Sequence, residues 1–248
     1  MRYIVTHGHI FKNAGTTFDS ALKAAFGKGF CDHRDDVAMR RGGADYLAQF
    51  ILDNPDIKAI SSHHLCNPLP ISNEFQCIPV YFIRNPLERI ISVYEYERKQ
   101  RTGTPGAVKA SSSSLEEYIC WRFLPSTPKI ISNYQTSYIG AQRFLRTDEK
   151  VSFDMLERAL KMISEPEVFI GIVDCFSESF NRISAGLKKY FPEVNFDYKS
   201  KNVQNGRSDD EKYKVALEQL QTVLPEVISE NELDLCLYYS AKKALGYL

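Results

Sequence analysis

The chain alternates between short apolar runs and segments in which apolar residues recur every three or four positions. The runs have the length and composition of buried strands, and they cover residues 3–7, 59–62, 78–83 and 168–173. The periodic segments are typical of amphipathic helices, and they cover residues 18–26, 46–52, 153–163, 176–187 and 233–245. We therefore predict the α/β class, with a single three-layer domain over residues 1–248 and a central, mainly parallel sheet flanked by helices.

One long segment interrupts this alternation. Residues 100–114 are rich in Thr, Gly, Pro, Ala and Ser, and the helical pattern resumes at Leu115. Such a composition is typical of loops. We predict a mobile loop within the domain rather than a linker between two domains.

The composition is that of an ordinary globular protein and narrows the classes of function. The 248 residues are 44% hydrophobic, and 31 basic side chains balance 31 acidic ones, so the formal net charge is zero. A neutral chain disfavours a surface that coats polyanions, so we expect no nucleic-acid partner, while a local basic pocket stays compatible with this charge. No apolar run approaches the roughly 18–20 residues that cross a bilayer, and we expect no membrane span.

The histidines and cysteines give little support to a metal site. All five histidines lie within the first 64 residues, and the six cysteines are spread along the chain without a CxxC pair. No pair has the ligand spacing of a structural zinc site, so we predict no metal.

Residues 9–18 form the most informative segment, because a predicted strand is followed there by small residues and a helix start. Such a turn leaves backbone N–H groups free at the positive end of the helix dipole, which suits an anion. Lys12 adds a charge, and Thr16 and Thr17 add hydroxyl donors. In the P-loop of nucleotide kinases the lysine follows the last glycine, whereas Lys12 precedes Gly15 by three positions. The segment is either an anion site or an ordinary tight turn with a surface lysine.

Residues 83–94 predict a second anion-binding turn. Arg84 follows a buried strand, at the edge where open α/β sheets place their ligands. Asn85 and Pro86 are suited to a helix start, and Ser92 lies in the second turn of that helix. We expect Arg84, Ser92 and the helix start to converge on one further phosphate.

Glu88 and Arg89 are the first charged residues of this predicted helix. The position of Glu88 is that of a capping-box residue, which favours a structural role over acid catalysis. Arg89 fits either a surface ion pair or a contact with the ligand.

Together the two turns resemble the sulfotransferase superfamily that uses 3′-phosphoadenosine-5′-phosphosulfate (PAPS). The matching stretches read His-Ile-Phe-Lys-Asn-Ala-Gly-Thr-Thr-Phe and Arg-Asn-Pro-Leu-Glu-Arg-Ile-Ile-Ser-Val-Tyr. Residues 133–136, 169–172 and 233–242 are similar to segments of its Golgi-type carbohydrate branch, which includes the heparan 2-O- and 6-O-sulfotransferases. The chain departs from the family pattern in carrying Phe11, Asn13 and Asn85 where Pro, Thr and Asp are usual.

The resemblance implies a P-loop-like sulfotransferase fold and transfer of a sulfuryl group from PAPS to an acceptor hydroxyl on an oligosaccharide or other glycan, without a metal. Adenosine 3′,5′-bisphosphate would be the product of the donor. The implied donor-binding residues of the first turn are Lys12, Asn13, Ala14, Gly15, Thr16, Thr17 and Phe18. In the second turn they are Arg84 and Ser92, which would hold the 3′-phosphate. Lys12 would also act in catalysis by neutralising charge on the leaving 5′-phosphate, and Trp121 and Tyr134 could line the acceptor cleft.

The reaction also needs a base for the acceptor hydroxyl, with a pKa near neutrality. His63 and His64 follow a predicted strand at the edge where both turns emerge. In the heparan 2-O-like branch a histidine in such a position, often after a small residue, is the base, and Ser62-His63 matches this pattern best. Because strand side chains alternate, we expect only one of His63 and His64 to face the donor. With an ordinary histidine pKa, the rate should rise through about pH 6–7.

Two other classes of function stay open on the sequence. One is a P-loop-like nucleotide kinase, and the other is a non-catalytic protein that binds a nucleotide or glycan on the same scaffold. The first residues show no signal-peptide pattern. If the chain is complete we expect a cytoplasmic protein, and if it is part of a longer protein the resemblance implies the Golgi lumen.

Overall fold

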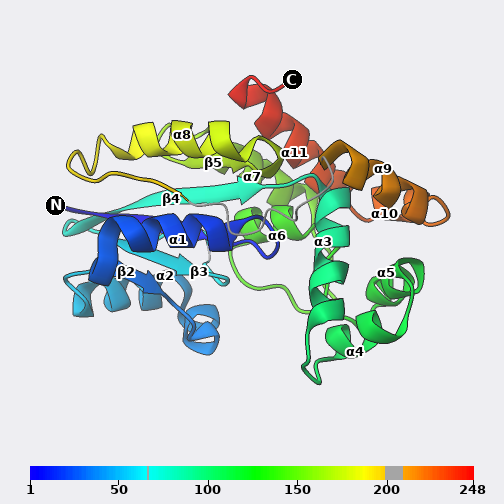
Figure 1. Ribbon diagram of the computed structural model, residues 1–248. Coiled ribbons are helices and arrows are strands. Elements are labelled where there is room, and N and C mark those ends of the chain that lie inside the picture. Colours follow the sequence, from blue (N-terminus) through cyan, green and yellow to red (C-terminus); the bar gives the residue numbers. More distant parts are fainter. Residues whose placement is uncertain (66, 199–208) are drawn as a thin grey trace.

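The computed structural model describes residues 1–65, 67–198 and 209–248 (Figure 1). Five strands form one parallel sheet in the order β2-β3-β1-β4-β5. They are β1 (Arg2–Gly8), β2 (Phe30–Asp32), β3 (Ala59–Ser62), β4 (Phe75–Ile83) and β5 (Phe169–Ile172). The predicted α/β class with a parallel sheet between helices is confirmed.

The helices fall into two sets. Those that flank the sheet are α1 (Gly15–Phe26), α2 (Asp36–Asp53), α6 (Tyr134–Gly140), α7 (Phe153–Ser164), α8 (Phe176–Leu187) and α11 (Glu232–Leu245). The others are α3 (Pro86–Lys99), α4 (Pro105–Ser112), α5 (Leu115–Phe123), α9 (Asp209–Leu220) and α10 (Leu224–Ser229), and these gather beyond the carboxyl ends of the strands (Figure 1). Helices of this second set share an apolar cluster of their own.

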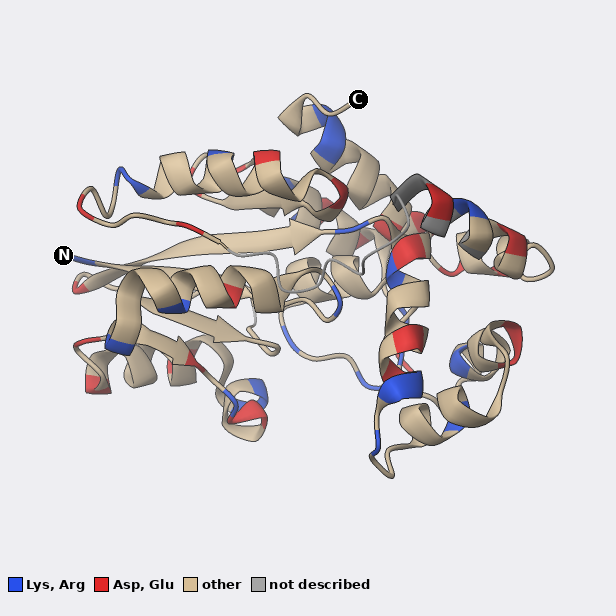
Figure 2. Ribbon diagram, in the orientation of Figure 1, with Lys and Arg blue, Asp and Glu red and all other residues tan. Residues whose placement is uncertain are grey.

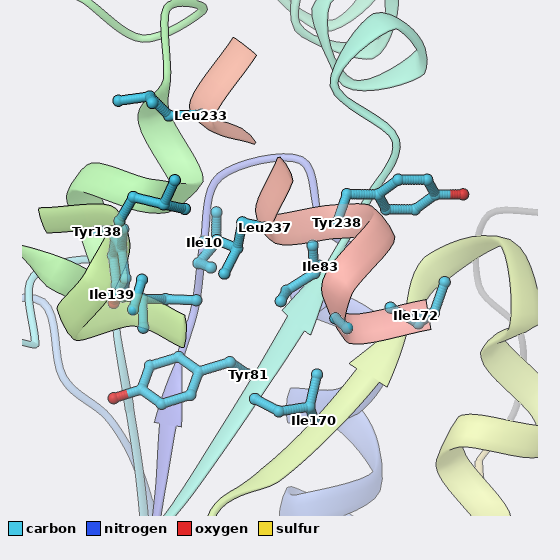
Figure 3. Packing of buried hydrophobic residues seen from close by; sticks show 13 residues of the cluster. Ile10, Tyr81, Ile83, Tyr138, Ile139, Ile170, Ile172, Leu233, Leu237 and Tyr238 are labelled. Atoms are coloured by element: carbon cyan, nitrogen blue, oxygen red, sulfur yellow. The ribbon is translucent and has the colours of Figure 1, made fainter. Parts of the chain in front are cut away.

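Alternate side chains of each strand enter two different cores, one on each face of the sheet. In β4, Ile78, Val80 and Phe82 pack with residues of α1 and α8. Tyr81 and Ile83 point the other way and pack with residues of α6, α7 and α11 (Figure 3). Helix α2 covers a further part of the sheet through its own apolar cluster. Helices therefore lie on both faces, which gives three layers.

The predicted loop of residues 100–114 is wrong over much of its length, because α4 occupies Pro105–Ser112. Thr104 caps this helix by accepting a hydrogen bond from the backbone N–H of Ala107, at 3.4 Å, and Pro105 takes the first position, where its missing N–H costs nothing. Ala107 and Ala110 are buried. The Ser- and Gly-rich composition obscured these start signals.

Helix α2 begins ten residues before the predicted start at residue 46. Asp35 caps it by accepting from the backbone N–H of Ala38. Gly43 interrupts the helix with a φ of 52°, a conformation that glycine adopts without steric cost. The sequence periodicity therefore revealed only the part of the helix after the interruption.

Over the described ranges, no helix has both the length and the apolar character needed to cross a bilayer, in agreement with the prediction of no membrane span. Acidic and basic residues are interspersed along most elements (Figure 2).

Gly140 lies where α6 contacts α7. A Cβ at this position would overlap the backbone carbonyl of Met155, which cannot move aside as the end of a flexible side chain can. We expect Gly140→Ala to lower the free energy of unfolding by about 1–3 kcal/mol, measured by urea denaturation. Gly103→Ala is the matched control, because a Cβ there meets open space, and its change should stay within about 0.5 kcal/mol. Equal losses in both variants would contradict this account of the α6–α7 contact.

Candidate functional site at the carboxyl edge of the sheet

The segments that follow β1, β3 and β4 meet at one edge of the sheet. Strand β1 lies between β3 and β4, and all three run in the same direction. The backbone N–H of His9 donates to the carbonyl of Ser62 at 3.0 Å, which extends the β1–β3 contact into the first turn. In open parallel sheets the crevice where the chain switches sides is the usual place for a ligand. The two predicted anion-binding turns therefore lie side by side there.

The first turn has an unusual backbone. Lys12 and Ala14 adopt the left-handed conformation, with φ of 67° and 59°. For residues with a Cβ this conformation costs roughly 1–2 kcal/mol each. Alternation of hand along a turn directs successive N–H groups to one side, which makes an anion-binding concavity. The N–H groups of Lys12 and residues 14–16 have no acceptor within residues 1–65, 67–198 and 209–248.

The side-chain amide of Gln135 in α6 joins the two turns. Gln135 is fully buried, and its Oε1 accepts hydrogen bonds from the Asn13 side chain (2.6 Å) and from the backbone N–H of Arg84 (2.9 Å). Its Nε2 donates to the carbonyl of Arg84 at 2.9 Å. Asp234 of α11 in turn accepts from the backbone N–H of Gln135 at 3.1 Å. The relative position of the two turns is thus set by buried hydrogen bonds.

Two arginines hold the carbonyl groups of the first turn. Arg84 donates through Nη1 to the carbonyl of Lys12 at 3.2 Å. Arg89 donates through Nε to the carbonyl of Phe11 at 3.0 Å and through Nη2 to that of Ile130 at 2.7 Å. Arg89 is 1% exposed and lies over the ring of Tyr134. Arg89 is therefore buried and supports the turn. This role differs from the two alternatives that the sequence left open, a surface ion pair and a contact with the ligand.

Lys12 is a half-buried cation whose surroundings are positive. Its Nζ lies 4.6 Å from the ring centre of Tyr96 on α3. Burial lowers the pKa of Lys12, and the charges of Arg84 and Lys99 lower it further. No acidic side chain pairs with Lys12 in the described part of the chain. An anion bound here would relieve this repulsion.

One side of α3 carries polar residues at four-residue intervals, namely Glu88, Ser92 and Tyr96. Arg84, four positions before Glu88, precedes the helix. Arg84 Nε lies 3.5 Å from Glu88 Oε2. Ser92 comes one turn after Glu88, on the side that Lys12 reaches through Tyr96. Asn85 caps α3 by accepting from the backbone N–H of Leu87 at 3.0 Å. The structure thus places the second turn and Lys12 around one stretch of α3.

Two predicted donor-binding side chains face the core instead. The Asn13 side chain is 1% exposed, and both hydrogens of its Nδ2 are used, by Gln135 and by the carbonyl of Phe82 at 2.7 Å. Phe18 is 1% exposed and packs against Phe82, with 5.2 Å between ring centres. Both side chains therefore lie under the turn, and the assignment of Asn13 and Phe18 to the donor stays a prediction. Thr16, by contrast, is exposed at the helix start.

His63 and His64 lie in the turn that follows β3 and face different surroundings. His63 donates through Nδ1 to the carbonyl of His9 at 2.7 Å. A carbonyl only accepts, so the proton sits on Nδ1 and the lone pair of the neutral ring is on Nε2. Burial, and then the neighbouring His9, lower the pKa of His63 to about 4. His63 is therefore a neutral imidazole beside the first turn near pH 7.

His64 turns toward α2 and a cavity. Its Nε2 lies 3.3 Å from Asp36, and burial lowers its pKa. The cavity has a volume of ≈ 240 Å³, and its lining includes His64, Tyr134, Tyr138 and Phe144. Trp121 packs against Tyr118 and Arg122, and its place in an acceptor cleft stays a prediction. Aromatic faces beside His64 thus come from α6 and the segment after it.

A buried His-Asp-His group lies beneath the first turn. Asp19 accepts from Nδ1 of His7 at 2.7 Å and from Nδ1 of His9 at 2.8 Å. Burial alone would raise the pKa of Asp19, but these two contacts outweigh it and hold the pKa well below its ordinary value. Asp19 is therefore a carboxylate. Hydrogen bonds account for all three groups, and the absence of a metal stays a prediction.

The fold and this edge define an α/β protein whose parallel sheet presents two polar turns and a histidine pair at its carboxyl end. No protein-family model matches the chain. A protein of Archaeoglobus fulgidus, described as uncharacterized, is 30% identical over 208 residues, which span 82% of this chain and 80% of that protein. The chain belongs to the same family as this archaeal protein.

Loss of the Gln135 amide should destabilise the protein. Gln135→Met keeps the length of the side chain but leaves the Asn13 amide and the Arg84 backbone groups buried without their partner. We expect a loss of about 2–3 kcal/mol in the free energy of unfolding. The control is Gln49→Met, since Gln49 is exposed on α2 and its side chain donates to Asp53 at the surface, and its change should stay within about 0.5 kcal/mol. A neutral Gln135→Met variant would refute the account of how the turns are held.

Proposed function

We propose that the protein is a PAPS-dependent sulfotransferase with a P-loop-like sulfotransferase fold, and that its acceptor is a hydroxyl group of a carbohydrate. The observation that carries the proposal is the unpaired charge of Lys12 beside the free N–H groups of the first turn, next to Arg84. Such a combination suits a ligand with two separate anionic groups. The resemblance of both turns to the PAPS-binding motifs supplies the identity of that ligand.

In this proposal the donor spans the two turns. The 5′-phosphosulfate takes the N–H groups of Ala14 to Thr16, with Lys12 and the hydroxyls of Thr16 and Thr17 around it. The 3′-phosphate takes the side of α3 that carries Ser92, with Arg84. Donors fixed before the reaction stabilise charge on the leaving phosphate at no further cost of reorganisation.

His63 is the proposed base. Its neutral ring has a lone pair on Nε2, and this atom accepts the proton of the acceptor hydroxyl as the hydroxyl oxygen attacks sulfur. The bond between sulfur and the bridging oxygen breaks, and the electron pair leaves with the 5′-phosphate. Lys12 and the N–H groups of the first turn then balance the added charge.

The same edge disfavours the nucleotide-kinase alternative. Phosphoryl transfer by P-loop enzymes relies on magnesium held by a P-loop hydroxyl and an aspartate. The residues that directly follow β3 and β4 are His63, His64 and Arg84, none of which is a magnesium ligand of this kind. Lys12 also stands on the other side of Gly15 from the kinase lysine.

Binding of adenosine 3′,5′-bisphosphate tests the donor assignment. By calorimetry it should bind far more tightly than AMP, because AMP lacks the group for Arg84 and Ser92. Arg84→Ala should reduce this preference about 10–100-fold, the range for one lost charge-assisted hydrogen bond. Arg98→Ala is the control on the same helix, since Arg98 is exposed and pairs with Glu95. Equal affinity for AMP and the bisphosphate would refute the assignment, and magnesium-dependent ATP binding would favour the kinase.

The pH dependence of turnover tests His63. Because the pKa of His63 is lowered to about 4, the rate at low substrate concentration should be flat between about pH 6 and 8. The rate should fall only below about pH 5, as His63 becomes protonated, and not through pH 6–7 as an ordinary histidine pKa predicts. His63→Ala should lower turnover roughly 10²–10⁴-fold while bisphosphate affinity holds.

The matched variant for this test is His64→Ala. His64 contacts Asp36 rather than the first turn, so this variant should retain most of the turnover. If His64→Ala is inactive and His63→Ala is active, the base is the other histidine. Full activity in both variants would exclude a histidine base at this position.

A further inference from the structure

A cavity lies beside the histidine pair, and two residues that line it carry buried polar atoms without partners. Its volume is ≈ 240 Å³, and its lining comes from α6, from the segments on either side of α6 and from the residues after β3. Ser132 is 6% exposed, and its Oγ has no hydrogen-bond partner in the described part of the chain. Nδ1 of His64 is likewise buried and unpartnered there. Buried polar groups normally have partners, so two unpartnered groups on one cavity indicate a ligand that supplies them.

The missing partner of His64 is a hydrogen-bond donor. Burial lowers the pKa of His64, so its ring is neutral near pH 7. Nε2 lies 3.3 Å from Asp36, and a carboxylate only accepts, so the proton of the neutral ring sits on Nε2. Nδ1 therefore carries the lone pair, and the hydroxyl of Ser132 can donate as well as accept. Hydroxyl groups of a ligand meet both requirements.

Aromatic rings and cations complete the lining. Tyr134, Tyr138 and Phe144 contribute rings, which suit the apolar side of a sugar ring. Arg40 and Lys129 contribute cations, and no carboxylate pairs with either of them in the described ranges of the chain. Unpaired cations beside a cavity attract an anionic group of the ligand.

The other charges around the cavity are paired, and its size limits the ligand. Arg143 pairs with Glu149 at 2.5 Å, and Arg146 pairs with Asp148 at 2.6 Å. Pockets that hold drug-sized ligands have volumes of roughly 300–1,000 Å³, and this cavity is smaller. It therefore suits one ring with its substituents rather than several units of a polymer.

We propose that this cavity binds a single sugar ring that carries an anionic group, either a carboxylate or a phosphate. One hydroxyl group of the sugar donates to Nδ1 of His64, and another pairs with Oγ of Ser132. The anionic group lies toward Arg40 and Lys129, and the ring packs among the aromatic side chains.

The cavity adjoins the candidate base. His64 directly follows His63 in the turn after β3. Tyr138 donates from its hydroxyl to the carbonyl of Ser62 at 2.7 Å, which joins the cavity wall to the end of β3. A sugar in the cavity therefore lies next to the turn that carries His63. That this sugar carries the acceptor hydroxyl rests on the proposed function.

Binding of small sugars tests the proposal. NMR titrations of the full chain with D-glucuronate, D-galacturonate and D-glucose 6-phosphate measure Kd for anionic sugars, and D-glucose and D-galactose are the neutral controls. At least one anionic sugar should bind about 10–100-fold more tightly than its neutral counterpart, the range for one charge-assisted hydrogen bond. The uronates and the phosphate distinguish the two sources of the anionic group. Binding should persist with adenosine 3′,5′-bisphosphate or inorganic pyrophosphate present, because these anions belong at the two turns.

Two variants with matched controls locate the sugar in the cavity. Ser132→Ala should weaken binding of the anionic sugar about 3–10-fold, because one hydrogen bond is lost. Ser184→Ala is its control, since Oγ of Ser184 is also buried without a partner but lies on α8, outside the cavity lining. Arg40→Met should reduce the preference for the anionic sugar about 10-fold. Arg41→Met, at the next and equally exposed position of α2, should keep this preference.

The outcomes separate this proposal from the proposed function. Binding of an anionic sugar without binding of the bisphosphate leaves the cavity assignment standing and removes the PAPS assignment. Binding of the bisphosphate without binding of any sugar does the reverse. The cavity assignment is also overturned if neutral sugars bind as tightly as anionic ones, if bisphosphate or pyrophosphate displaces the sugar, or if Ser132→Ala binds it like the wild type.

Kinetics of transfer give a second readout for His64. His64→Ala should raise the KM for the sugar about 3–10-fold and leave most of the turnover at saturating sugar, because a contact that is equal in the ground and transition states changes KM alone. An unchanged KM would overturn the role of His64 as a sugar-binding residue.

Discussion

The buried amide of Gln135 is the interaction on which the geometry of the candidate site depends, because its hydrogen bonds join the two predicted anion-binding turns. A turn with two left-handed residues is unfavourable by roughly 2–4 kcal/mol in isolation, so it needs outside support. Gln135 gives that support from one side through Asn13. Arg84 and Arg89 give it from the other side through the carbonyl groups of the turn. Because the carbonyl groups of Phe11 and Lys12 are occupied in this way, the backbone N–H groups of the turn are the ones available to a ligand.

Gln135 is itself held by a reciprocal contact between the starts of α6 and α11. Asp234, at the start of α11, accepts from the backbone N–H groups of Gln135 and Thr136 in the first turn of α6. Asn133, which precedes α6, accepts from the backbone N–H groups of Leu233 and Asp234. Each helix therefore satisfies the free N–H groups of the other, and the carboxylate of Asp234 also lies at the positive end of the α6 dipole. The segments 133–136 and 233–235, which are far apart in the sequence, work as one unit.

The sequence predicted the elements that depend on local pattern and missed those that depend on contacts. Strands β1, β3, β4 and β5 and the start of α3 at Asn85 follow from apolar runs and capping residues, and the structure confirms them. The role of Asn13 could not be predicted, because its partner Gln135 lies 122 positions away. The His7-Asp19-His9 group could have been predicted, since His7 near the end of β1 and His9 just after it are two positions apart, and Asp19 follows on the next helix. The pKa of His63 depends on burial by distant elements and has no sequence signal.

The three departures from the sulfotransferase pattern have separate physical explanations. Asn85 caps α3 with the oxygen that an aspartate would use, so this change keeps the function of the position. Asn13 offers two N–H donors, which a threonine lacks, and both are needed for Phe82 and Gln135. Phe11 places its ring against Tyr96, whose own ring lies under Lys12. Asn13 thus connects the first turn to α6 and to β4, and Phe11 connects it to α3.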